Sequence, residues 1–292
     1  MGRAGAVIAA LFLALVAAGA AAEEPAHVGH AGWIKSINGC RIWSLDATPS
    51  LSVRWAGACK KGVAEGKGLV EWFEHGRPSE SYHAEYRGGH EYIRGTYLYA
   101  NGQRYEGEYL DYLENGQGVY VYSNRDRYAG DFRENRQTGR GTYVFASGNR
   151  YEGDFKNGVF DGYGVLVLNG GDRYEGKFKN GVFDSHGVLT LRGGDRYDGD
   201  FVNGRPNGHG VYVWTSGYRY DGEWRDGHEN GSGVLQYANG DRFEGQFLND
   251  LPNGPGSFHM TGGTVYSGNW SNGCFRDGDR RAAVGVALAV CR

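Results

Sequence analysis

Residues 151–173 read YEGDFKNGVFDGYGVLVLNGGDR, and this stretch decides the fold. Tyr151, Gly153 and Phe155 alternate with two acidic residues, which predicts a strand with one ringed face and one charged face. The Lys-Asn-Gly stretch at 156–158 predicts a turn, and the apolar run at 165–168 predicts a second strand. The Asn-Gly-Gly stretch that follows predicts another turn, so this segment is one β-hairpin joined tightly to its neighbour.

The same pattern recurs every 23 residues along most of the chain. An aromatic residue opens each unit, glycine follows two residues later, and a second aromatic follows four residues later. The opening aromatics are Tyr105, Tyr128, Tyr151, Tyr174, Tyr197, Tyr220, Phe243 and Tyr266. A fixed period of this size is typical of a repeat architecture. We therefore predict an all-β antiparallel meander over residues 105–275.

The glycine after each opening aromatic is expected on the ringed face of its strand. We interpret it as space for a ring from the neighbouring strand, which a side chain would displace. Aromatic pairs contribute roughly 0.5–1.5 kcal/mol each beyond the burial of their area. A ladder of such pairs can hold a thin sheet that has no second layer.

This motif resembles the MORN repeat. Residues 151–155, the turn at 157–158 and the Gly-x-Gly at 162–164 match it position by position, and eight units keep the register. The resemblance implies an elongated, single-layer antiparallel sheet with an interaction or scaffold role and no chemistry. Ser185 replaces the first glycine of one Gly-x-Gly, and Asp277 and Asp279 stand where the last pair is expected. We expect these departures to weaken individual turns.

The composition agrees with a repeat array. The 292 residues include 52 glycines, and this share of the chain is well above the usual glycine content of about 7%. Their fixed offsets indicate turns and close backbone approach, and an aromatic content of 14% argues against a disordered chain. The unbroken period favours one elongated array over two domains.

Residues 1–22 have the composition of a secretory signal peptide. Arg3 is the only charged residue in this segment, and Ala4–Ala22 is apolar up to an Ala-Ala-Ala end. We predict cleavage after Ala22 and a periplasmic or extracellular protein, with an uncleaved membrane anchor as the alternative. Loss of Arg3 changes the net charge from −3 to −4, which does not favour nucleic acid as a partner.

The ends of the chain depart from the regular period. We interpret residues 23–54 as a lead-in followed by cap strands at 40–43 and 51–55. Residues 55–104 form degenerate repeats, interrupted by a linker at 77–81. Alternating apolar residues at 284–290 predict a C-terminal cap strand within 276–292, with a short helix as the alternative.

Four cysteines lie two near each end: Cys40, Cys59, Cys274 and Cys291. Behind a secretory signal, an even number of cysteines predicts disulfides. Two strands per unit would place the ends of an open sheet on the order of 90 Å apart. We therefore expect the local pairs Cys40–Cys59 and Cys274–Cys291, with a metal site as the alternative.

No constellation in the sequence predicts catalysis, a cofactor or a metal. His186 and His209 recur at the same position of successive units, which predicts a surface stripe. Rows of acids and arginines, such as Glu175 and Arg173, predict cross-strand charge pairs, with a glycosidase acid pair as the alternative. Because every unit carries the same set, no unit is singled out as catalytic. The parts outside the repeats are too short for a catalytic domain.

We therefore expect a non-catalytic interaction module with an unknown protein partner. The candidate surface is the aromatic face, with the alternative that its rings only stack on one another. Its members are Tyr109, Phe132, Phe155, Phe178, Phe201, Trp224, Tyr120, Tyr143, Tyr212 and Trp214. Membrane phospholipid is a second candidate that the resemblance suggests, although the balanced charge does not support it. Glycan or cell-wall binding on exposed rings is a third.

Overall fold

The computed structural model describes residues 30–99 and 101–291 and assigns 23 strands to one open sheet. The predicted all-β meander is confirmed, because nearly every strand pairs antiparallel with the next in sequence. A parallel contact between Arg41 and Val63 is an exception. The predicted signal peptide lies outside the described residues. Within the described ranges, no helix has the length and hydropathy needed to cross a membrane.

The chain divides into two compact units. The first holds the described residues up to Ala146 together with Phe155–Val159, and the second holds Ser147–Asp154 and the described residues from Phe160 on. The strands before the division are β1 (Gly32–Lys35), β2 (Arg41–Ser44), β3 (Leu51–Lys60), β4 (Val63–Glu74), β5 (Arg77–Arg87), β6 (His90–Leu98), β7 (Arg104–Leu110), β8 (Leu113–Val121), β9 (Arg127–Arg133) and β10 (Arg136–Val144).

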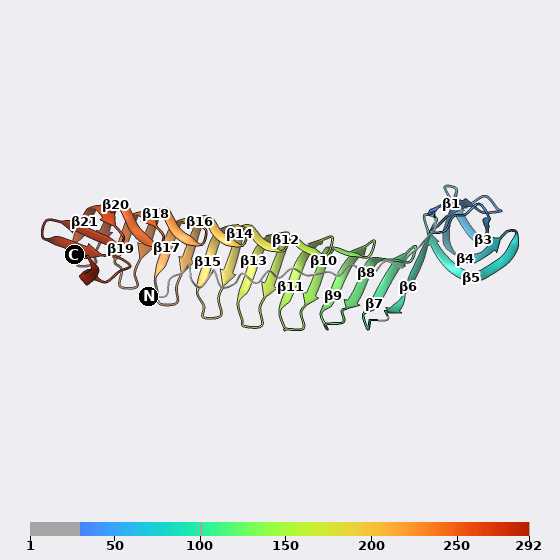
Figure 1. Cartoon of the computed structure of the whole chain (residues 1–292), viewed down its shortest axis with the longest axis horizontal. Helices are drawn as coiled ribbons and strands as arrows, with labels where there is room; N and C mark the ends of the chain where they lie inside the picture. The colour runs from blue at the N-terminus through green and yellow to red at the C-terminus, as the bar shows by residue number, and fades with distance from the viewer. Residues whose placement is uncertain (1–29, 100, 292) are drawn as a thin grey trace. The chain divides into compact units, whose positions relative to one another are not determined.

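Figure 1 shows the strands of the second unit from β13 to β21 side by side in chain order. From the division onward the strands are β11 (Arg150–Lys156), β12 (Val159–Val167), β13 (Arg173–Lys179), β14 (Val182–Thr190), β15 (Arg196–Val202), β16 (Arg205–Val213), β17 (Arg219–Arg225), β18 (His228–Gln236), β19 (Arg242–Leu248), β20 (Leu251–His259), β21 (Val265–Ser271), β22 (Cys274–Asp277) and β23 (Arg280–Ala283). A short 3₁₀ helix, η1 (Leu288–Val290), follows.

A glycine row runs across the sheet beneath the opening rings. In β13, Gly176 lies opposite Gly164 on one side and Gly187 on the other. The Tyr174 ring covers Gly176 and Gly187, and its hydroxyl donates to the carbonyl of Lys177 at 3.0 Å. The prediction that each glycine makes room for a neighbouring strand's ring is wrong in one respect. From Gly107 to Gly245, the ring that needs the space belongs to the glycine's own strand, and only at Gly268 does it come from the neighbouring strand, as Phe275 of β22.

The opening rings form the core of each unit. Tyr174 stacks on Phe183 with ring centroids 3.7 Å apart. The rings of Phe178 and Phe201 meet Tyr174 edge-on at 5.1 and 5.3 Å. Because Phe201 belongs to the next repeat, each core is completed by its neighbour. The sheet therefore needs no second layer to bury these rings.

The turn within each regular repeat closes through two residues with positive φ. Asn180 and Gly181 have φ of 51° and 81°, the combination that suits a two-residue hairpin turn. Further along, the first glycine of the Gly-x-Gly also has positive φ, as at Gly162 (120°). Ser185 takes that position in β14 with φ of 57°, so a non-glycine residue is held in the left-handed region.

The N-terminal strands differ from expectation at two places. The predicted loose lead-in contains β1, which pairs with β2. The predicted linker at 77–81 is part of β5, because β4 and β5 are long strands that stay paired from Gly66 to Glu74 around one bulge. Trp55 is fully buried in the core here. The predicted Cys40–Cys59 disulfide is confirmed, with Cα atoms 5.8 Å apart.

The C-terminal cap also differs from expectation. The strand lies at β23 and pairs with β22, while the apolar alternation at 284–290 forms bends and η1. Gly285 has φ of 76°, which turns the chain so that Cys291 reaches Cys274. This second predicted disulfide is also confirmed, with Cα atoms 5.4 Å apart. The covalent closure of this segment explains why it does not extend as a strand.

Candidate functional site

The ten rings of the predicted interaction face belong mainly to the core. Three are at most 3% exposed, Tyr120, Tyr143 and Tyr212, and five are at most 4% exposed, Phe132, Phe155, Phe178, Phe201 and Trp224. Tyr109 and Trp214 are half-buried. Eight of these rings therefore pack in the core, in line with the alternative interpretation, while Tyr109 and Trp214 keep part of their surface.

The charged rows lie on the opposite face, here called the outer face. It carries pairs such as Arg173–Glu175, Arg196–Asp198 and Arg219–Asp221, with N–O distances of 2.6–2.7 Å. These pairs join residues two apart in one strand, so the expected cross-strand pairing is wrong. The residues directly opposite Arg173 on the neighbouring strands are Val167 and Thr190, which carry no charge. The acid within its reach is Glu175, on the same face of its own strand. Such exposed pairs contribute a few tenths to about 1 kcal/mol each.

The histidine stripe is also on the outer face. His186 Nε2 lies 3.1 Å from Asp198 Oδ1, and His209 Nε2 lies 3.3 Å from Asp221 Oδ1. Each histidine therefore faces the acid of the following strand. Across residues 30–99 and 101–291, no group of three or more His, Cys, Asp or Glu residues could hold a metal ion.

Sequence reasoning missed a column of buried residues nine positions after each opening aromatic. In three repeats this residue is a phenylalanine beside the opening tyrosine: Phe160 stacks on Tyr151, Phe183 stacks on Tyr174, and Phe275 lies edge-on to Tyr266. In three others it is a buried acid, 7% exposed at Glu91, 1% at Glu114 and 5% at Glu229. Comparing this column across repeats would have revealed the acids, because an ionised carboxylate is costly in an aromatic core.

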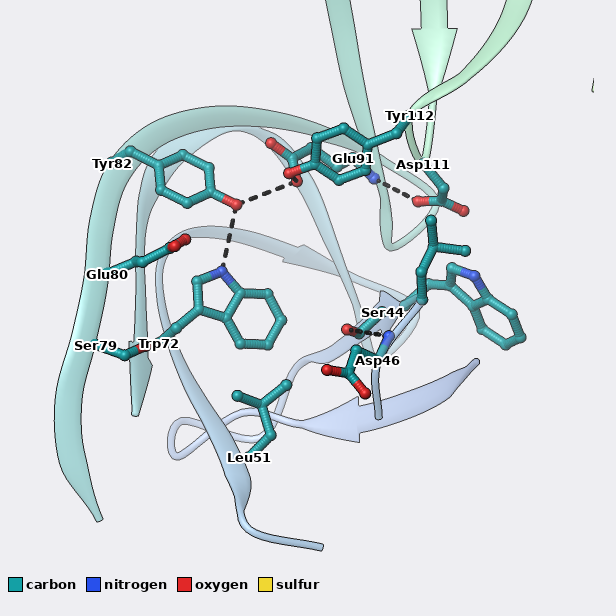
Figure 2. A pocket seen from close by; sticks show the side chains of 12 residues that line it. Ser44, Asp46, Leu51, Trp72, Ser79, Glu80, Tyr82, Glu91, Asp111 and Tyr112 are labelled. Carbon is teal, nitrogen blue, oxygen red and sulfur yellow. Dashed lines mark hydrogen bonds between the residues drawn. The ribbon is translucent and has the colours of Figure 1, made fainter. Parts of the chain in front are cut away.

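Glu91 borders a cavity in the first unit. The cavity has a volume of about 420 Å³ and is framed by β2, β4, β5, β6 and the turn between β7 and β8. Its aromatic wall consists of Trp43, Trp72, Tyr82 and Tyr112. Figure 2 shows the Glu91 carboxyl group near the hydroxyl ends of Tyr82 and Tyr112, with Asp111 to one side.

A chain of hydrogen bonds converges on Glu91. Trp72 Nε1 donates to the Tyr82 hydroxyl at 3.3 Å, and that hydroxyl donates to Glu91 Oε2 at 3.2 Å. The Tyr112 hydroxyl also donates to Glu91 Oε2 at 3.2 Å. The backbone N–H of Glu91 donates to Asp111 Oδ1 at 3.1 Å, while Asp111 Oδ2 faces the His90 ring. The aromatic donors thus point at one carboxylate oxygen.

Burial sets the electrostatics of this cluster. It raises the pKa of Glu91, although the hydroxyls of Tyr112 and Tyr82 oppose the shift. Burial and the nearby Glu91 charge raise the pKa of Tyr82 and Tyr112. Both tyrosines therefore keep their protons and remain donors at neutral pH.

Comparison with solved structures finds distant resemblances. The G-box domain of the microcephaly protein CPAP is 16% identical, with a TM-score of 0.35, over 61% of this chain and 100% of that chain. The TCP domain of Drosophila melanogaster SAS-4 is 14% identical, with a TM-score of 0.25, over 62% of this chain and 84% of that one. A mutant TCP10 domain of Danio rerio CPAP is 12% identical, with a TM-score of 0.33, over 63% and 97%. A search of curated protein sequences finds no match.

A model of a protein family matches the regular repeats of this chain. The MORN repeat model matches seven consecutive segments, at residues 105–127, 128–150, 151–173, 174–196, 197–217, 220–242 and 243–265. The matched segments cover more than half of the chain and coincide with the hairpins described above. The chain belongs to the MORN repeat family.

Proposed function

We propose that this protein is an exported, non-catalytic MORN-repeat scaffold that mediates protein–protein interaction. The observation that supports the proposal most is the sameness of the units. Each repeat buries its rings and presents a similar outer face of paired charges, which suits a repeated contact surface better than a catalytic centre. Catalysis needs one distinct pocket with reacting groups, and the regular repeats differ from one another mainly in their core.

The disulfides support export to an oxidising compartment. Both cysteine pairs are bonded, and such bonds persist outside the reducing cytosol. The signal-like segment at residues 1–22 agrees with this route. We therefore propose a periplasmic or extracellular location.

The outer face favours a protein partner over an anionic membrane. Its arginines are paired with acids, as at Arg196 and Arg219, so the face lacks the net positive charge that attracts anionic lipids. Exposed valines lie between these arginines, as Val213 of β16, 39% exposed, does between Arg196 and Arg219. A surface of alternating charge and aliphatic carbon suits a protein with complementary alternation.

Capture of partners by the chain without residues 1–22, from the envelope extract of its source cell, tests the proposal. Arg196→Glu combined with Arg219→Glu alters the outer face. The matched control, Arg54→Glu combined with Arg77→Glu, changes two exposed arginines outside the regular repeats. We expect the same partner with wild type and control, and its loss with the outer-face variant.

Parallel measurements separate the alternatives. Flotation with anionic liposomes and a glycan array would show binding to a lipid or a sugar. Strong binding in either assay, together with no partner sensitive to the outer-face variant, would contradict the proposed function.

A further inference from the structure

We propose that the cavity beside Glu91 is a binding site for a small organic cation. The ammonium group would sit against Glu91, within the wall formed by Trp43, Trp72, Tyr82 and Tyr112. This site goes beyond the scaffold role, because ten of its twelve lining residues precede the regular repeats. Four observations carry the inference.

Three of the four aromatic side chains of the wall already use their hydrogen-bond donors. Trp72 gives its N–H to Tyr82, and Tyr82 and Tyr112 give their hydroxyl protons to Glu91 Oε2. Among the described residues, no donor hydrogen-bonds to Glu91 Oε1, although the side chain is only 7% exposed. The cavity therefore offers chiefly acceptors, and a complementary ligand must bring donors or positive charge.

The charge of the lining has one sign. The twelve residues that line the cavity include Asp46, Glu80, Glu91 and Asp111 and contain no lysine or arginine. Asp111 is engaged by the Glu91 backbone and by His90, whereas no hydrogen bond within the described chain involves the carboxylate of Asp46 or Glu80. A phosphate, sulfate or carboxylate ligand would be repelled here, while a cation would be attracted.

Aromatic walls and a suitable volume favour an organic cation over a bare metal ion. A volume of about 420 Å³ lies in the range of small-molecule sites. Tyrosine and tryptophan faces attract ammonium groups through the ring quadrupole, by up to about 2 kcal/mol when the site excludes water. In the described part of the chain, the acids here do not form a group that could hold a metal.

Tyr112 takes a costly backbone conformation to reach the cavity. Its φ is 64°, in the left-handed region, at the second position of a hairpin turn. The equivalent position in five regular repeats is glycine, at Gly158, Gly181, Gly204, Gly227 and Gly273. A tyrosine held there costs roughly 1–2 kcal/mol relative to glycine. The hydroxyl contact with Glu91 is what this conformation makes available.

The test is calorimetric titration of the full mature chain with choline, with putrescine and with a blocked lysine amide. Each has an ammonium group. Putrescine represents a free small amine, and the blocked lysine amide represents a lysine side chain of a protein. The control ligand is the neutral isostere of choline, in which a tert-butyl group replaces the trimethylammonium group. We expect at least one cation to bind at least about tenfold more tightly than the isostere, the ratio that corresponds to 1.4 kcal/mol.

Three variants locate the site. Glu91→Gln and Glu80→Gln each remove one carboxylate from the cavity, and Glu114→Gln is the matched control at the equivalent core position of the next repeat. We expect the first two to weaken cation binding at least about threefold, and the control to leave it unchanged. Because Glu80 is exposed and structurally unengaged, its variant decides the question if Glu91→Gln fails to fold.

A fourth variant separates binding from structure. Tyr112→Asn copies Asn135, the residue that the next repeat has at this turn position. It should raise thermal stability by relieving the backbone strain at this turn position, and it should weaken cation binding. The inference would be overturned if the isostere bound as tightly as the cations, or if none of the three cations bound. It would also be overturned if neither Glu80→Gln nor Glu91→Gln changed cation binding.

Discussion

At the scale of single residues, glycine is required where a ring lies flat on the backbone. A Cβ built on Gly176 would lie 2.6 Å from the Gly187 Cα and 2.6 Å from the Tyr174 hydroxyl oxygen. The first of these atoms belongs to the backbone of the paired strand and cannot move away without breaking the ladder. The glycine therefore permits the ring position that completes each core.

Gly176→Val should destabilise the protein by about 3 kcal/mol, the upper end of the usual cost of overpacking. Urea unfolding of the variant and of wild type measures this difference. Gly170→Val is the matched control, because nothing lies within 4 Å of a Cβ at Gly170. An unchanged midpoint for Gly176→Val would show that the ring does not cover this glycine in solution.

Ser185 offers the opposite case, because a glycine is missing where the backbone favours one. Its φ of 57° costs an L-residue about 1 kcal/mol or more, so Ser185→Gly should stabilise the protein by about that amount. The same substitution in extended strand, Ser81→Gly in β5, should reduce stability slightly. The two unfolding free energies should therefore move in opposite directions, and a shared direction would contradict the assigned conformations.

At the scale of one hairpin, the residue nine positions after the opening aromatic decides how each core is completed. Phenylalanine fills it with a stacked ring, whereas Glu114 fills it with a carboxylate that accepts from the Tyr99 hydroxyl at 2.7 Å. The other oxygen, Oε2, has no hydrogen-bond partner among the described residues. Burial raises the pKa of Glu114 from its ordinary value of 4.5 to about 7. This hairpin thus contains a proton-dependent core.

Glu114→Gln should stabilise the protein at pH 8 and have little effect at pH 4. Because the pKa of Glu114 is higher in the folded chain, the folded chain binds more protons between about pH 4.5 and 7, and wild-type stability falls as pH rises through that window. The loss amounts to about 3 kcal/mol at high pH. The next repeat already uses glutamine here, since Gln137 Nε2 donates to the Tyr122 hydroxyl.

Chemical unfolding of both chains at several pH values between 4 and 8 measures this effect. Glu152→Gln serves as the control, because Glu152 is exposed and paired with Arg150 on the outer face. The stability difference between Glu114→Gln and wild type should grow with pH, whereas that of the control should stay within a few tenths of a kcal/mol. A pH-independent difference at Glu114 would contradict the raised pKa.

The hairpins could be predicted from the sequence because their signals are local. The alternation at Tyr151–Phe155 and the Asn157–Gly158 turn act over a few residues, so they fix the strands and the turn. The Cys40–Cys59 pair also followed from local reach. The cavity could not be predicted this way, because Trp72, Glu91 and Tyr112 meet only after separate strands and a turn have folded together.

At the scale of the whole molecule, stability depends on contact between neighbouring repeats. Tyr174 is covered by Phe201 of the next repeat, and Tyr220 by Phe247 of the repeat after its own. In such an array an end repeat has a neighbour on one side only. The two disulfides close the segments at these ends, where that support is missing.

The central claim is that neighbour contacts hold the repeats and the disulfides secure the ends. Native-state hydrogen exchange on wild type and on Cys274→Ser combined with Cys291→Ser tests it most directly. We expect β21 to β23 to lose protection in the variant while β13 to β18 keep theirs. Uniform loss of protection through all the repeats, or no loss at the C-terminal strands, would contradict the account.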